Sequence, residues 1–108
     1  MESFGDRLTE AMERKSSCVV AGLDPRTDAL PDEFRARAGR SRADAAQAVL
    51  NFNLHVLDAV APHCVAVKPQ SAFYEALGWE GVRAYGETVR AARERGLLVI
   101  GDVKRGDI

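Results

Sequence analysis

The sequence contains no long apolar run. Its longest apolar stretches have only the length of a β-strand, far short of the roughly 20 consecutive apolar residues that a membrane-spanning helix needs. Residues 1–15 alternate charged and apolar side chains and therefore lack the uninterrupted apolar segment of a signal peptide. These absences predict a cytoplasmic protein that neither crosses a membrane nor carries an export signal.

An excess of charge of one sign is also missing. The chain has 15 basic and 16 acidic side chains and a net charge of −1, so it has no strong field to attract a nucleic acid or an anionic membrane surface. We therefore expect no nucleic-acid partner and no membrane partner. Apolar residues make up 46% and charged residues 29% of the 108 residues, which is the composition of an ordinary soluble domain.

Cysteine is scarce, and the two that are present suggest no chemistry. Cys18 and Cys64 each begin an apolar run, so both are expected to be small, buried, reduced thiols. His63 is adjacent to Cys64, but neighbouring residues of a strand point to opposite faces. The sequence therefore predicts neither a metal site nor a cysteine nucleophile.

Apolar residues recur with a helical period in some stretches and form short continuous runs in others. Ser3 with Asp6, and Ser41 with Asp44, have the spacing of N-terminal capping pairs, and Gly96 has the position of a C-terminal cap. The pattern predicts helices over residues 3–15, 32–38, 41–61 and 79–95, and strands over residues 18–23, 65–68 and 97–102.

The same pattern predicts which faces are buried. The strand over 18–23 is apolar throughout, which is typical of a parallel strand buried on both faces. On the last helix, the inward residues are expected to be Val82, Tyr85, Val89 and Ala92. On the helix before it, they are expected to be Ala45, Ala48, Val49, Phe52, Val56, Ala59 and Val60.

Strands that alternate with helices predict right-handed crossovers and a parallel sheet, and therefore the α/β class. The sequence reaches Ile108 directly after the third strand, with no helix to cover that strand. A complete (β/α)8 barrel needs about 250 residues. Residues 1–108 are interpreted as the N-terminal portion of such a TIM barrel, about three βα units, truncated after strand 3.

Each predicted strand is apolar until its C-terminal end, where a charge appears. These charges are Asp24, Lys68, and Asp102 with Lys104. Ligands bind at the carboxyl ends of parallel strands, so the charges are expected to converge on one site. Asp102 and Lys104 are two residues apart and should share a face, and Asp107 should project from the following loop. An alternating network of this kind keeps lysines protonated and carboxylates ionised, although each charge alone could simply be solvated.

Three segments carry a resemblance to a known family. Asp102-Val103-Lys104-Arg105-Gly106-Asp107-Ile108 resembles the Asp-x-Lys-x-x-Asp-Ile signature of the orotidine 5'-phosphate decarboxylases. Gly22-Leu23-Asp24 and Val67-Lys68-Pro69-Gln70-Ser71-Ala72-Phe73-Tyr74-Glu75 agree with it, and the second is similar to the longer bacterial branch. The resemblance implies a (β/α)8 barrel, a homodimer, no cofactor and no metal, and conversion of orotidine 5'-phosphate to UMP.

The resemblance also implies a role for each matching residue. Lys104 corresponds to the lysine that protonates C6 of the pyrimidine as carbon dioxide is lost, and Asp102 to the aspartate placed against the substrate carboxylate. Lys68 corresponds to a lysine of the same charge network that contacts the ribose, and Asp24 to an aspartate that hydrogen-bonds a ribose hydroxyl. Asp107 corresponds to the aspartate that crosses the dimer interface into the partner's site. Ile108, the last residue of the signature, is expected to lie in the substrate-binding site beside it.

Two alternatives remain open. The first is a magnesium-dependent sugar-phosphate decarboxylase or aldolase of the same barrel group, although the Lys68-Pro69-Gln70 stretch and the long first connection argue against it. The second is a non-catalytic fragment that associates through its open sheet edge. In barrels of this kind the phosphate often binds the loops after strands seven and eight. These 108 residues are therefore predicted to be inactive alone.

Overall fold

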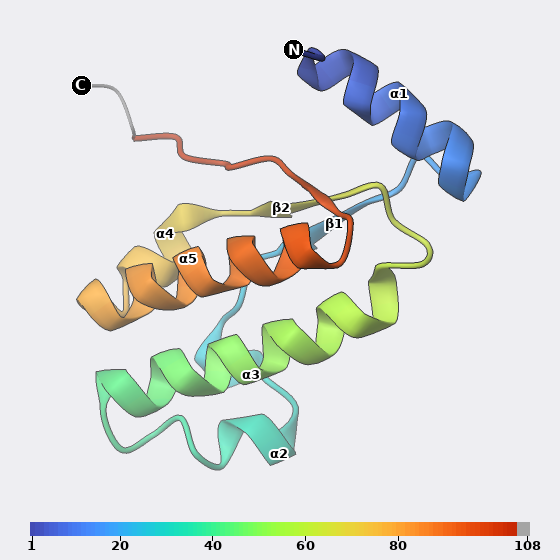
Figure 1. Cartoon of the computed structure of the whole chain (residues 1–108). Coiled ribbons are helices and arrows are strands. Elements are labelled where there is room, and N and C mark those ends of the chain that lie inside the picture. The colour runs from blue at the N-terminus through green and yellow to red at the C-terminus, as the bar shows by residue number, and fades with distance from the viewer. Residues whose placement is uncertain (106–108) are drawn as a thin grey trace.

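Helices and strands alternate along residues 1–105, the part of the chain that the computed structural model describes (Figure 1). The elements are α1 (Phe4–Lys15), β1 (Val20–Leu23), the 3-10 helix η1 (Thr27–Ala29), α2 (Asp32–Arg35), α3 (Arg42–Val60), β2 (Ala66–Pro69), α4 (Ser71–Glu75), α5 (Gly78–Glu94) and β3 (Leu98–Val99). The predicted order of helix and strand is confirmed. The short helices η1 and α4 were not predicted, and α2 is shorter than expected.

The three strands form one parallel sheet in the order β1-β2-β3. Its ladder continues beyond β3, because the Asp102 amide donates to the Pro69 carbonyl at 3.1 Å and the Ser71 amide donates to the Asp102 carbonyl at 3.1 Å. This confirms the predicted parallel α/β arrangement. It also brings Asp102 to the same edge of the sheet as the end of β2.

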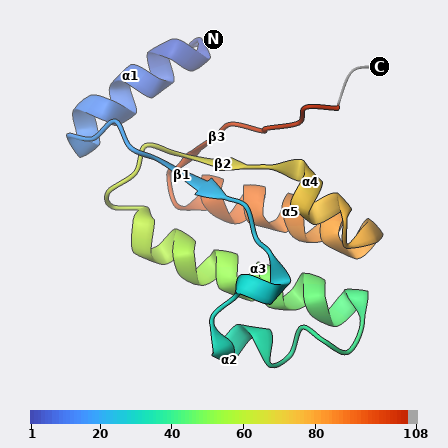
Figure 2. The same cartoon turned by 180° about the vertical axis from the view of Figure 1, so that it is seen from behind.

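Two long helices cover one face of the sheet, whereas the other face is covered only where the strands begin. Figures 1 and 2 show α3 and α5 side by side beneath the sheet, and α1 on the other side, over the end at which the strands begin. Leu23 and Val67 pack with Leu57 and Ala92 between the two layers. Ala11 of α1 packs against the start of β2. The molecule is therefore a thin layer, with extents of 43 × 36 × 19 Å.

This one-sided packing corrects two sequence-based expectations. Val19 is 54% and Val20 is 39% exposed, so the first strand is not buried on both faces. It is an edge strand, and α1 covers only the beginning of the second face. Cys64 is buried as predicted, but Cys18 is exposed, because it lies in the connection that leaves α1 before β1 begins.

The buried face of α5 is rotated by about one residue from the predicted face. Val82 was expected to point inward but is 52% exposed, whereas Ala84 and Thr88 are buried. Gly81 is also buried because α5 passes very close to α4 at that point. On α3, the predicted inward residue Ala59 is exposed. The buried residues on that helix include Leu57 and Asn53, which were not predicted.

The predicted capping residues at Ser3, Ser41 and Gly96 are confirmed. Ser3 and Asp6 form a reciprocal capping box at the start of α1, and the Ser41 hydroxyl accepts from the Asp44 amide at the start of α3. Gly96 has a φ of 76° directly after α5, a left-handed conformation that glycine adopts without strain.

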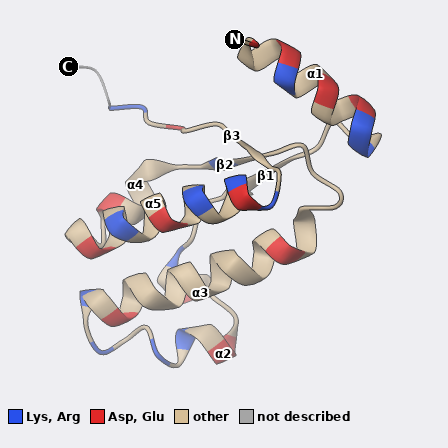
Figure 3. Ribbon diagram, viewed as in Figure 1, with Lys and Arg blue, Asp and Glu red and all other residues tan. Residues whose placement is uncertain are grey.

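No helix within residues 1–105 is long and apolar enough to cross a membrane. Acidic and basic residues are interspersed along α1 and α5 (Figure 3).

Candidate active site

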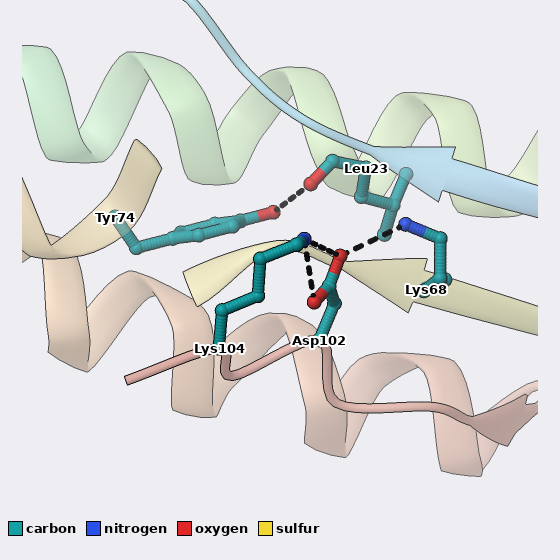
Figure 4. Close-up of polar contacts among 5 residues, drawn as sticks. All are labelled: Leu23, Lys68, Tyr74, Asp102 and Lys104. Atoms are coloured by element: carbon teal, nitrogen blue, oxygen red, sulfur yellow. Dashed lines mark hydrogen bonds and ion pairs between the residues drawn. The ribbon is translucent and has the colours of Figure 1, made fainter. Parts of the chain in front are cut away.

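Two lysines and one aspartate meet at the carboxyl ends of β2 and β3. Nζ of Lys104 lies 2.7 Å from Oδ2 and 2.9 Å from Oδ1 of Asp102, and Nζ of Lys68 lies 3.3 Å from the same Oδ2. Figure 4 shows the two ammonium groups on either side of the carboxylate. The prediction that Asp102 and Lys104 share a face, with Lys68 converging on them, is confirmed.

Strand geometry places these side chains together. Lys68 is opposite Gly22 in the β1–β2 register, and the glycine has no side chain to occupy the space beside the lysine. Asp102 continues the ladder two residues beyond Ile100, and alternate residues of an extended strand point to one face. Asp102 has a 19% exposed side chain, against 39% for Lys68 and 67% for Lys104. The carboxylate is therefore the most enclosed member of the group.

The ion pairs control the charge of this carboxylate. The hydrogen bond from Lys104 holds the pKa of Asp102 below its ordinary value, and Lys68 acts in the same direction, while partial desolvation opposes both. The carboxylate therefore remains ionised at neutral pH. A fixed carboxylate between two ammonium groups can repel the carboxylate of a substrate. It can also orient the ammonium group of Lys104 for proton transfer.

The remaining predicted residues are not part of this cluster. Asp24 follows β1 and is exposed, and its Oδ2 lies 3.7 Å from the position that a Cβ on Gly22 would occupy. Within residues 1–105, no hydrogen bond or ion pair joins Asp24 to Lys68 or Asp102. Asp107 and Ile108 lie outside the residues that the structure describes.

A buried polar network beside the site was not predicted. Tyr74, Asn53 and Thr88 are each at most 1% exposed and are joined by hydrogen bonds. Burial, and to a smaller extent the charge of Asp24, raises the pKa of Tyr74, although the hydrogen bond from Asn53 opposes them. The sequence signal that could have revealed this network is one polar residue on the otherwise apolar buried face of each helix, Asn53 on α3 and Thr88 on α5. The ring of Tyr74 also packs edge-on against Tyr85, with centroids 5.1 Å apart.

A hollow of about 270 Å³ lies next to the charged cluster, lined by Gln70, Ser71, Ala72, Asp102, Lys104 and Arg105. Among residues 1–105, no group of three His, Cys, Asp or Glu side chains has the arrangement of a metal site.

Comparison with known proteins identifies relatives of this chain. No protein-family model matches the chain. Orotidine 5'-phosphate decarboxylase from Rhodopirellula baltica is 41% identical over 109 residues, which cover all of this chain and 36% of the relative. The chain is a homologue of the orotidine 5'-phosphate decarboxylases. The decarboxylase from Streptomyces coelicolor agrees, with 40% identity over 108 residues and 36% of its length covered.

Solved structures of orotidine 5'-phosphate decarboxylases share the fold. The Leishmania donovani enzyme superposes with a TM-score of 0.73 and 33% identity, over 99% of this chain and 35% of the decarboxylase. The predicted fold class is therefore confirmed as α/β, with three parallel strands that match part of the decarboxylase TIM barrel. The chain spans about a third of the length of the curated decarboxylases that it matches.

Proposed function

We propose that residues 1–108 are the N-terminal part of an enzyme that decarboxylates orotidine 5'-phosphate to UMP, the last step of de novo pyrimidine synthesis. The observation that carries the proposal is the contact of Lys104 and Lys68 with one ionised aspartate, Asp102, at the strand ends of a homologous fold. The carboxyl ends of parallel strands are where barrel enzymes bind their substrates.

The proposed chemistry breaks one carbon–carbon bond. The substrate carboxylate leaves as carbon dioxide, and its bonding electron pair remains on C6 of the pyrimidine. The Lys104 ammonium stabilises this developing negative charge and then donates a proton to C6, after which the lysine is reprotonated from solvent. The balance requires no oxidant, reductant or cofactor.

The charge network prepares this step. Asp102 holds the ammonium group of Lys104 by two short contacts of 2.7 and 2.9 Å, so the proton donor is oriented before the substrate binds. In the proposed complex, Asp102 lies against the substrate carboxylate and repels it until carbon dioxide leaves. Lys68 and Asp24 hold the ribose, away from the bond that breaks, and this remote binding energy offsets the repulsion.

We infer a cytoplasmic homodimer in which Asp107 enters the partner's site and Ile108 lies beside the substrate, as the resemblance implies. The groups that hold the phosphate and much of the pyrimidine would come from the remaining two thirds of the enzyme. Residues 1–108 alone are therefore expected not to turn over orotidine 5'-phosphate, and measurable turnover by the purified 108-residue chain would contradict this.

The direct test is Lys104→Ala in the intact protein, with turnover followed by the loss of orotidylate absorbance. Removal of the proton donor is expected to lower kcat by about a thousandfold. Arg93→Ala, which removes an exposed cation from α5, is the matched control and should retain full activity. Unchanged turnover by Lys104→Ala would refute the assignment, and turnover abolished by a chelator would favour the magnesium-dependent alternative.

A further inference from the structure

The hydrogen-bond ladder between β1 and β2 lacks one donor. The Val65 amide donates to the Val19 carbonyl at 2.9 Å, and the bonds of a parallel ladder repeat every two residues. Two steps further along, Leu23 is opposite Pro69 in the register. Proline has no amide hydrogen, so β2 has no donor for the Leu23 carbonyl.

The side chain of Tyr74 supplies the missing donor. Its hydroxyl donates to the Leu23 carbonyl at 3.1 Å, as Figure 4 shows. Tyr74 is fully buried and Leu23 is 4% exposed. A buried carbonyl without a partner is costly. The hydroxyl therefore takes the place of the proline amide at the last step of the ladder.

The surrounding network fixes the direction of this hydrogen bond. The Thr88 hydroxyl donates to the Ala84 carbonyl at 2.8 Å, so toward Asn53 it can only accept. The Asn53 amide donates to Thr88 at 3.1 Å and to the Tyr74 oxygen at 3.0 Å. With its oxygen accepting from Asn53, the Tyr74 hydroxyl must direct its own proton to Leu23.

The peptide that is held in this way carries a predicted site residue. The Leu23 carbonyl and the Asp24 amide belong to one planar peptide group, so fixing one fixes the other. Asp24 begins the loop after β1 and has no side-chain partner among residues 1–105. Its position therefore depends on its backbone rather than on contacts of its own carboxylate.

We propose that Tyr74 is a positioning residue: its hydroxyl replaces the ladder donor that Pro69 lacks, and it thereby holds Asp24 in place to bind a ribose hydroxyl. The ribose contact rests on the proposed function. The anchoring of the Leu23–Asp24 peptide does not, because it follows from the register and the hydrogen bonds alone.

The kinetic test is a double-mutant cycle in the intact protein. Tyr74→Phe is expected to raise KM for orotidine 5'-phosphate about fivefold, the effect of one net hydrogen bond, with kcat changed by less than about twofold. In an Asp24→Ala background the same substitution should have no further effect on KM. Val65→Ala, a buried substitution in a different cluster, controls for lost stability and should leave KM unchanged. An unchanged KM in Tyr74→Phe, or an equal change in both backgrounds, would overturn the proposal.

A second measurement does not depend on activity. Tyr74→Phe should accelerate amide hydrogen exchange in residues 20–26, and the added substitution Pro69→Ala should slow it again by restoring a backbone donor to Leu23. If Tyr74→Phe does not fold, recovery of the fold by Pro69→Ala supports the proposal, and a double variant that remains unfolded overturns it. A wild-type protein without orotidylate turnover would refute the proposed function, whereas the exchange data would still decide whether Tyr74 anchors the peptide.

Discussion

Gly81 lies where α5 passes closest to α4, and the structure leaves no room for a larger residue there. A Cβ atom built on Gly81 would lie 1.9 Å from the Tyr74 carbonyl oxygen and 2.7 Å from Cβ of Leu77. Both are far inside van der Waals contact, and the first obstacle is backbone. The Tyr74 carbonyl also accepts the Leu77 amide at 3.0 Å, so it cannot turn aside without breaking that bond.

The substitution Gly81→Ala changes stability in two opposite ways. Alanine favours a helix over glycine by about 1 kcal/mol. Overpacking of a closely packed contact costs about 1–3 kcal/mol, and more where the backbone must shift. Because the Tyr74 oxygen and the new Cβ, 1.9 Å apart as built, would have to separate by about 1.5 Å to reach an ordinary contact distance of ~3.5 Å, we take the upper end of the range. The net expectation is a loss of about 2 kcal/mol.

Gly86 provides a matched control in the same helix. It is exposed, and nothing lies within 4 Å of a Cβ built on it. The only expected effect of Gly86→Ala is therefore the greater helix preference of alanine, which should stabilise the protein by about 0.5–1 kcal/mol. Both variants add the same methyl group to the same helix, and the expected changes in the free energy of unfolding have opposite signs.

Urea unfolding of the intact protein, followed by circular dichroism, measures both variants. The free energy of unfolding should fall for Gly81→Ala and rise for Gly86→Ala, with equal m-values. If Gly81→Ala is as stable as Gly86→Ala, the close approach of α4 and α5 is wrong. The position of Tyr74 would then also be in doubt, because its backbone forms the contact.

Two further predictions concern charged side chains. Nζ of Lys15 donates to the carbonyls of Ala61 and Cys64 at 2.8 and 2.9 Å, just after the end of α3. Lys15→Met should therefore lower the free energy of unfolding by about 1–2 kcal/mol. An unchanged urea midpoint would show that these two hydrogen bonds do not stabilise the protein. Asp102 has a lowered pKa because of the hydrogen bond from Lys104, so its contribution to stability is complete above its ordinary pKa and is lost as pH falls through the lowered value. Carboxyl NMR titration should find this low pKa in the wild type and a higher one in Lys104→Met; equal values in both would refute the assignment of the cause.

Much of the local structure could be predicted because it depends on neighbouring residues. The capping box at Ser3 and the left-handed Gly96 follow from residue type and spacing. The contact between Asp102 and Lys104 follows from strand alternation, since both residues lie on one short segment. Burial was harder to predict. Val82 was placed on the inner face of α5, but that face is set by the small residue Gly81 against α4, a contact between different helices.

The sequence by itself determined the order of elements, the parallel sheet and the charges at its strand ends, because periodicity, capping and alternation are local properties of the chain. Only the tertiary structure decided how those ends are held. The Leu23 carbonyl is satisfied by Tyr74, 51 positions away, and Tyr74 by Asn53 in α3. No spacing rule predicts such a partner, because a buried hydrogen bond can form between any two segments that packing brings together.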